Sequence, residues 1–184
     1  MAVEARDGLR ILGVDPGSRI TGYGIIDAWG QRMRYVDCGV IRIQTESLPE
    51  RLGVIFAGMS ELIARHRPQT LAIEQVFVNR NVDSAMKLGQ ARGAAICAGV
   101  HVGLTVTEYT PRAVKKAIVG NGGADKIQVQ HMVTALLELP DTPQADAADA
   151  LGLAVCHAHH AASAARIAQA GGIPIRRARG GRWR

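Results

Sequence analysis

The chain has 184 residues, 47% of them hydrophobic and 21% charged, which suits a single globular domain with a sizeable core. Its formal net charge at pH 7 is +6, and much of that excess lies in an arginine-rich tail after residue 175 that contains no acid. This composition excludes a disordered chain, and because we find neither a secretory signal nor an apolar stretch of about 18 residues, we expect a cytoplasmic protein that does not cross a membrane.

Three strands are predicted near the N-terminus, over residues 10–14, 21–28 and 33–43. Pro16-Gly17 and Trp29-Gly30 are typical turn pairs and separate them. Because the connections are short, the three strands should form an antiparallel meander.

Helices and strands alternate in the rest of the chain. The predicted elements are a helix over 48–66, a strand over 70–75, a helix over 83–98, a strand over 102–109, a helix opened by Thr110-Pro111 and broken by the glycine-rich segment 120–123, a helix over 125–139 and a helix from Thr142-Pro143 to about 165. A helical crossover makes the fourth strand parallel to the first and places the two side by side. We therefore predict an α/β fold with a five-stranded mixed sheet flanked by helices, in which antiparallel strands 1–3 precede parallel strands 4 and 5. The domain should cover 1–170, and 171–184 should form a flexible basic tail, which would serve either for solubility or for contact with a polyanion.

Four acids occupy positions where a carboxylate is costly to bury. Asp15 and Glu74 each end an apolar run, and Asp146 and Asp149 lie three residues apart in an alanine-rich stretch, with no Lys or Arg beside any of them. The predicted topology places Asp15 and Glu74 at one end of neighbouring strands, and Asp146 and Asp149 on one helix face. Each acid alone also fits a turn, a loop or the first turn of a helix. Together they predict a site for two divalent cations, Mg²⁺ or Mn²⁺, of the kind that catalyses phosphoryl transfer.

Basic side chains stand on both sides of the glycine-rich segment 120–123. Lys115 and Lys126 are either solvated surface residues or parts of an arm that closes over a phosphate backbone. Arg112 and Lys116 are weaker candidates for backbone contacts.

An aromatic residue follows Glu74 in a polar loop. Phe77 covers the edge of the core or inserts among unstacked bases, where stacking contributes about 1–3 kcal/mol per base. Arg80 in the same loop is a candidate phosphate contact.

Small residues mark one face of the helix that contains residues 86–97. Gly89 and Gly93 are one helical turn apart and would allow close packing, either within the core or across a dimer seam.

Cysteine and histidine residues do not predict a second metal site. Cys38, Cys97 and Cys156 are far apart and are expected to be buried thiols in a reducing compartment. His157 and His160 share a helix face without a Cys or Glu partner, and we interpret them as ordinary residues late in the helix.

Four segments taken together resemble the RuvC-type Holliday junction resolvases: LGVDPGSRITGYG at 12–24, IEQVF at 73–77, KLGQARG at 87–93 and DAADAL at 146–151. The resemblance covers nearly the whole chain. It implies an RNase H-like fold and a homodimeric endonuclease of recombination and repair, which nicks two opposing strands of a four-way DNA junction to give 5′-phosphate and 3′-hydroxyl ends. A branch-migration helicase is the implied partner.

The same resemblance assigns roles to individual residues. Asp15, Glu74, Asp146 and Asp149 match the family's catalytic acids. Lys115 and Lys126 match lysines near the scissile phosphate, and Phe77 matches the residue that enters the branch point.

Other functions remain open at this stage. The segment 13–17 is similar to the phosphate loop of sugar kinases and actin-like ATPases, although those proteins need about twice this length. A catalytically silent junction-binding scaffold would rest on the basic tail and Phe77. A less structure-selective RNase H-like nuclease or transposase relative would cut linear duplex as readily as a junction.

Overall fold

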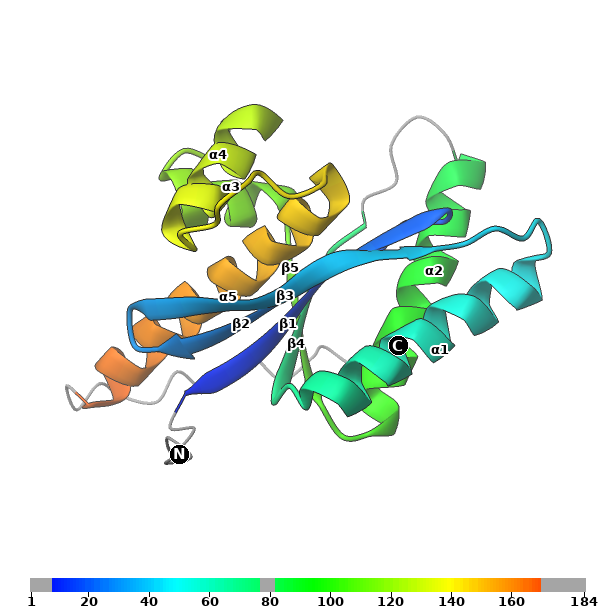
Figure 1. Cartoon of the computed structure of the whole chain (residues 1–184), viewed down its shortest axis with the longest axis horizontal. Coiled ribbons are helices and arrows are strands. Elements are labelled where there is room, and N and C mark those ends of the chain that lie inside the picture. Colours follow the sequence, from blue (N-terminus) through cyan, green and yellow to red (C-terminus); the bar gives the residue numbers. More distant parts are fainter. Residues whose placement is uncertain (1–7, 77–81, 170–184) are drawn as a thin grey trace, which may run out of the picture.

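A mixed sheet of five strands forms the centre of the protein in our computed structural model, which describes residues 8–76 and 82–169 (Figure 1). The strands are β1 (Leu9–Asp15), β2 (Ile20–Trp29), β3 (Arg32–Arg42), β4 (Thr70–Glu74) and β5 (Thr105–Tyr109). The helices are α1 (Leu48–His66), α2 (Val82–His101), α3 (Pro111–Val119), α4 (Lys126–Leu136) and α5 (Ala145–Gln169). None of these helices is long and apolar enough to span a bilayer.

The strand order in the sheet is β3-β2-β1-β4-β5. β2 pairs with β1 and β3 in antiparallel fashion, whereas β4 lies parallel to both β1 and β5. The predicted meander and the parallel placement of strand 4 beside strand 1 are both confirmed. As a result β1 and β4 end at the same edge of the sheet, with Asp15 and Glu74 as their last residues.

Helices cover both faces of the sheet. α5 lies against one face with α3 and α4 beside it, and α1 and α2 cover the other face (Figure 1). Alternate residues of β1 point to opposite faces. Ile11 is fully buried in the core formed with α3, α4 and α5, while Leu12 and Val14 are fully buried in the core formed with α1 and α2.

Glycines in the first two strands allow α5 to lie directly on the sheet. A Cβ at Gly24 would be only 2.6 Å from the backbone nitrogen of Leu151, and a Cβ at Gly22 would overlap the carbonyl group of Asp146. The backbone of α5 can therefore contact the sheet directly, whereas a larger residue at these positions would push the helix away. This contact fixes the position of the N-terminal part of α5, which carries two of the acids.

Several element ends differ from the sequence prediction. α2 continues to His101, and a turn through Gly103 (φ +80°) delays β5 until Thr105 instead of residue 102. α4 ends at Leu136 instead of 139. Thr142-Pro143 does not open the last helix, because the first helical hydrogen bond joins the nitrogen of Ala148 to the carbonyl of Gln144. α5 then runs beyond the predicted residue 165, to Gln169.

The prediction of three buried thiols was wrong in part. Cys156 is buried, Cys38 is half-buried and Cys97 is exposed. Cys97 lies on the outer side of α2. The apolar residues that surround it in the sequence gave no indication that its side chain would be exposed. The predicted basic tail, 171–184, lies outside the described residues.

Candidate active site

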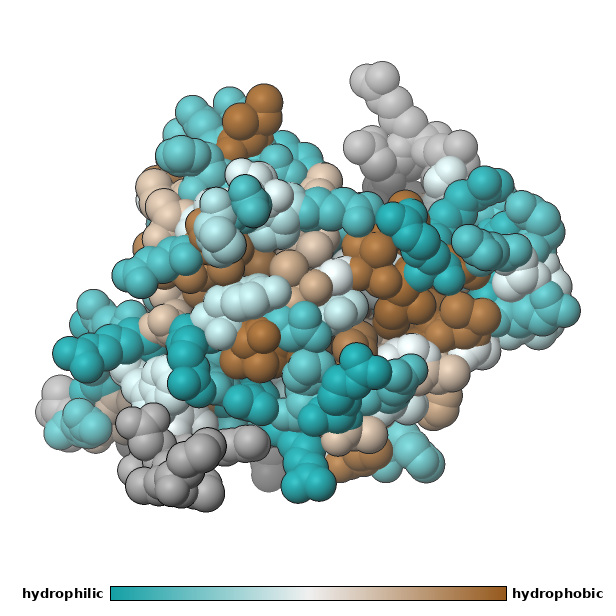
Figure 2. All heavy atoms as spheres, viewed as in Figure 1, coloured by the Kyte–Doolittle hydropathy of each residue, from teal (hydrophilic) through white to brown (hydrophobic). Residues whose placement is uncertain are grey.

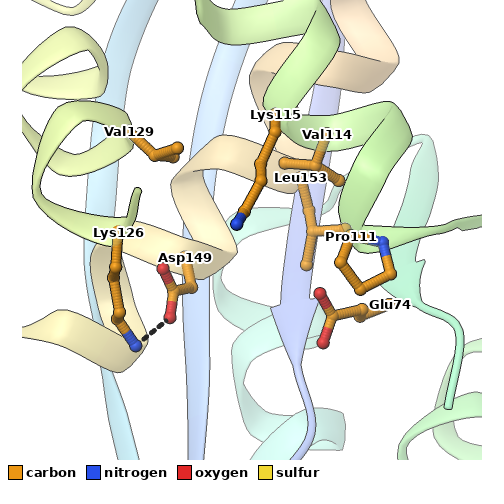
Figure 3. Close-up of a pocket in the computed structure, with 8 residues that line it drawn as sticks. All are labelled: Glu74, Pro111, Val114, Lys115, Lys126, Val129, Asp149 and Leu153. Carbon is orange, nitrogen blue, oxygen red and sulfur yellow. Dashed lines mark ion pairs between the residues drawn. The ribbon is translucent and has the colours of Figure 1, made fainter. Parts of the chain in front are cut away.

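A cleft of about 180 Å³ opens where β4, α3, α4 and α5 meet. Two acids and two lysines line it: Glu74 from β4, Asp149 from α5, Lys115 from α3 and Lys126 from α4 (Figure 3). Its apolar lining consists of Pro111, Val114, Val129 and Leu153. Such walls restrict water around the charged groups and strengthen their interactions.

All four predicted acids interact at this end of the sheet. Burial raises the pKa of Asp15 to about 7, with further contributions from the charges of Glu74, Asp149 and Asp146 and an opposing one from Lys126. Burial also raises the pKa of Glu74, as does Asp149, whereas Lys126 and Lys115 lower it. The structure thus brings together carboxylates from β1, β4 and α5 that are more than 130 residues apart at the extremes.

One of the acids has a basic partner, contrary to the sequence expectation. The Lys126 Nζ lies 2.6 Å from Asp149 Oδ2, and this bond is the main reason that the pKa of Lys126 is raised (Figure 3). Among the described residues, no three or more Asp, Glu, His or Cys side chains are grouped closely enough to hold a metal ion as they stand. Two acids and two lysines thus balance in the lining of the cleft, Asp15 and Asp146 add negative charge beside it, and Asp149 is already engaged in an ion pair.

Local helix signals place the two lysines. Thr110 caps α3, since its hydroxyl accepts a hydrogen bond from the nitrogen of Ala113 at 3.1 Å, and Lys115 follows one turn later. Asp125 caps α4 through a capping box with Gln128, so that Lys126 is the first residue of that helix. α3 begins at the predicted Pro111, α4 begins one residue after the predicted start because Asp125 is its cap, and both lysines reach the cleft.

The weaker DNA-contact candidates lie away from the cleft. Arg112 and Lys116 are exposed on α3. Lys116 lines a separate groove with His159 and His160 instead of the acid-lined cleft. Phe77 and Arg80 lie outside the described residues.

Two further contacts were not foreseen. The Arg92 Nε donates to the carbonyl oxygen of Glu74 at 2.9 Å. The Tyr109 hydroxyl lies 2.8 Å from Nδ1 of His157, whose pKa burial lowers. His157 is therefore a half-buried residue near the middle of α5, and its interpretation as an ordinary late-helix residue was wrong. Arg92 belongs to a quoted motif, but the Tyr109–His157 pair left no signal in the sequence.

One face of α2 leaves room for further atoms within the described residues. A Cβ at Gly89 or Gly93 would meet nothing within 4 Å. Val82 and Met86 on the same helix are about two-thirds exposed, at 62% and 60%. Figure 2 shows hydrophobic side chains gathered in the part of the view where α1 and α2 lie. Small and apolar residues on an open helix face suit contact with another surface.

Comparisons with known proteins agree with this geometry. Residues 11–157 match the family described as crossover junction endodeoxyribonuclease RuvC. The RuvC protein of Marinobacter nauticus is 59% identical over 88% of this chain and 93% of its own length, and that of Alkalilimnicola ehrlichii is 56% identical over 88% and 98%.

Solved structures show the same fold. The structure of Thermus thermophilus RuvC in complex with a Holliday junction substrate is 34% identical over 85% of this chain and 96% of its own, with a TM-score of 0.80. The yeast mitochondrial Holliday junction resolvase Ydc2 shares the fold, with 12% identity and a TM-score of 0.63. The acid-lined cleft at the end of β1 and β4, the sheet order and the match over nearly the whole length lead to one conclusion: this chain belongs to the RuvC family of crossover junction endodeoxyribonucleases.

Proposed function

We propose that this endonuclease cuts four-way DNA junctions in a metal-dependent reaction at the acid-lined cleft, with Asp15, Glu74, Asp146 and Asp149 holding two Mg²⁺ ions. The observation that carries the proposal is the electrostatic state of Asp15. Its pKa of about 7 reflects burial beside three other carboxylates. Such a concentration of negative charge is unfavourable without cations, and its oxygen atoms are the ligands that Mg²⁺ and Mn²⁺ prefer.

The acids and the lysines of the cleft have different proposed roles. Asp15 interacts with all three other acids and would therefore hold a cation together with any of them. Bound ions supply positive charge at the attacking and leaving oxygen atoms of the phosphodiester. Asp149 Oδ2 is paired with the Nζ of Lys126, so Asp149 would hold a cation either through its other oxygen or after releasing this ammonium group.

Lys115 and Lys126 are proposed to stabilise the negative charge that develops on the scissile phosphate. Both line the cleft, and both oppose the charge of Glu74. Release from Asp149 would leave the Lys126 ammonium group free to meet the phosphate. Ion binding and the placement of this lysine would then be linked.

The DNA duplex requires contacts beyond the cleft. We assign Arg112 and Lys116, both exposed on α3, to the phosphate backbone. Phe77 and Arg80 stay predictions from the sequence, the first for the branch point and the second for a phosphate.

Paired cuts on opposing strands require two active sites at a fixed separation, and a two-fold dimer provides them. The open face of α2 around Gly89 and Gly93 is the proposed seam, because the monomer leaves it uncovered. By family resemblance, the dimer would act in the cytoplasm with a branch-migration helicase.

The test is nicking of a mobile four-way junction with Mg²⁺, with Mn²⁺ and with chelator. Asp15→Asn should abolish nicking in either metal. Its junction affinity should be unchanged or slightly higher, because the substitution removes a negative charge near the phosphates.

Three results would contradict the proposal. Nicking in the presence of chelator would exclude the metal, and a fully active Asp15→Asn enzyme would exclude the assigned site. Equal cutting of linear duplex would favour the less structure-selective nuclease.

A further inference from the structure

Arg92 lies where α2 meets the last residues of β4 and β5. Its side chain is only 19% exposed, although it carries a permanent charge. The guanidinium group makes two contacts: Nε donates to the carbonyl oxygen of Glu74 at 2.9 Å, and the Nη2 nitrogen forms an ion pair with Glu108 of β5. A largely buried charge needs hydrogen-bonding partners, and these contacts supply them for Nε and Nη2.

The contact with Glu74 occurs where β4 has lost its partner on the β1 side, although Glu74 still pairs with Tyr109 of β5. The pairing of β1 with β4 ends at Ile73, one residue before Glu74. On the other side, the nitrogen of Gln75 donates to the carbonyl of Tyr109 at 2.8 Å. Arg92 therefore holds the carbonyl group of Glu74 at the edge of the sheet, immediately before the chain leaves β4.

We infer that Arg92 is a positioning residue for Glu74, which fixes the backbone that carries this carboxylate toward the cleft. The inference rests on the proposed role of Glu74 as a metal ligand. Arg92 does not line the cleft and so acts through Glu74. A planar fork bonded to both a carbonyl and a carboxylate sets direction as well as charge, which a lysine cannot reproduce.

The chain offers a matched control in α1. The Arg51 Nε donates to the carbonyl of Thr45 at 2.8 Å, and its NH2 group pairs with Glu46 at 2.8 Å. Its side chain is 12% exposed. Arg51 thus repeats the residue type, burial and contact pattern of Arg92 at a place with no acid-lined cleft.

The experiment compares Arg92→Gln, Arg92→Lys and Arg51→Gln. Binding of Mn²⁺ alone to the DNA-free protein is measured from the free Mn²⁺ signal in electron paramagnetic resonance. The Mg²⁺ dependence of single-turnover nicking and the junction Kd are measured in parallel. We expect Arg92→Gln to weaken Mn²⁺ binding and raise the Mg²⁺ requirement by about 10–100-fold, as is typical when a partner of a metal ligand is removed. Arg92→Lys should rescue little, Arg51→Gln should match the wild type, and junction Kd should stay unchanged in all three.

A second variant covers the possibility that Arg92→Gln fails to fold. Glu108→Gln removes the ion pair but keeps the hydrogen bond from Arg92 to Glu74, so its metal affinity should lie between those of the wild type and Arg92→Gln. Metal affinities of Arg92→Gln and Glu108→Gln equal to that of Arg51→Gln would overturn the inference, as would full rescue by Arg92→Lys. Failure of the proposed function would give a different result from failure of this inference. The wild-type protein itself would then bind no Mn²⁺, or would nick the junction without a divalent cation.

Discussion

Asp15 lies at the end of β1, where burial and the charges of Glu74, Asp149 and Asp146 raise its pKa from 3.8 to about 7. The folded protein consequently binds a proton on Asp15 in a range of pH where the unfolded chain has released it. The contribution of Asp15 to the stability of the metal-free protein then falls as the pH rises from about 4 to about 7, because the native state holds the additional proton. Ionised Asp15, which we propose as a metal ligand, therefore opposes folding in the absence of cations.

Asp15→Asn removes this titration, so the variant should be more stable than the wild type in chelator at high pH. The difference should be near zero at pH 4, grow up to pH 7 and stay level above it, reaching on the order of 1–3 kcal/mol after allowance for solvent screening. Urea unfolding at pH 4.5, 6 and 8 measures it. Saturating Mg²⁺ should narrow the gap by stabilising the wild type. An equal difference at pH 4.5 and pH 8 would contradict the assigned cause.

The sequence predicted functional residues where a charged side chain interrupts an apolar run and no neighbouring residue of opposite charge would pair with it. All four acids could be picked out because each interrupts an apolar run, and the structure brings them to one end of the sheet. The ion pair between Lys126 and Asp149 could not be predicted in the same way. Those residues lie 23 positions apart on different helices, and no periodic pattern relates them.

At the scale of elements, the site depends on how closely α5 approaches the sheet. Gly22 pairs with Asp15 across β1 and β2, and a Cβ on it would overlap the carbonyl of Asp146. One residue without a side chain thus sets the separation between two of the proposed metal ligands. The strand carrying Gly22 and the helix carrying Asp146 are in backbone contact at this point.

Gly22→Ala should push the first turn of α5 away from β1. We expect a loss of stability of about 1–3 kcal/mol from overpacking and a fall in nicking rate on the order of 100-fold, because small displacements of ligands are costly to catalysis. Thermal unfolding and single-turnover nicking at saturating Mg²⁺ measure the two effects.

Gly53→Ala is the control, since Gly53 is exposed on α1 with nothing within 4 Å of its Cβ position. That change should stabilise the protein by about 0.5–1 kcal/mol through helix propensity and leave nicking unchanged. Equal nicking rates for Gly22→Ala and Gly53→Ala would show that catalysis does not depend on the close packing of α5 against the sheet.

Strong local signals also decided which element ends could be predicted. α1 was predicted over its observed range, and the starts of α3 and α4 followed from Thr110 and Asp125, whose side chains cap their own helices. The start of α5 could not be predicted, because Thr142-Pro143 resembles a cap but the helix begins at Ala145. Likewise, the apolar residues after Ala98 fit either a strand or the end of a helix. In the structure Val100 continues α2 and is 58% exposed, so burial of an apolar side chain does not mark the end of this helix.

On the scale of the whole molecule, the two faces of the sheet have different roles. α3, α4 and α5 build the cleft on one side, and α1 and α2 cover the other. α2 nevertheless touches the site through Arg92, which contacts Glu74 and lies between Gly89 and Gly93 in the sequence. A dimer formed on the open face of α2 would therefore pack on the helix whose Arg92 holds the backbone of Glu74, one of the proposed metal ligands.

Gly89→Gln tests the seam, because the monomer has room for the new side chain while a closely packed partner does not. The variant should remain folded but become monomeric in sedimentation experiments, with Gly53→Gln on α1 as a control that stays dimeric. On a supercoiled plasmid that extrudes a cruciform, paired cuts within one binding event give linear DNA, whereas a single nick gives an open circle. Gly89→Gln should therefore shift the products from linear DNA to open circles, since one subunit carries one cleft. The seam would be excluded if the wild-type protein is monomeric at the concentrations at which it resolves junctions. If Gly89→Gln stays dimeric and still yields linear DNA, the dimer interface must lie on another face.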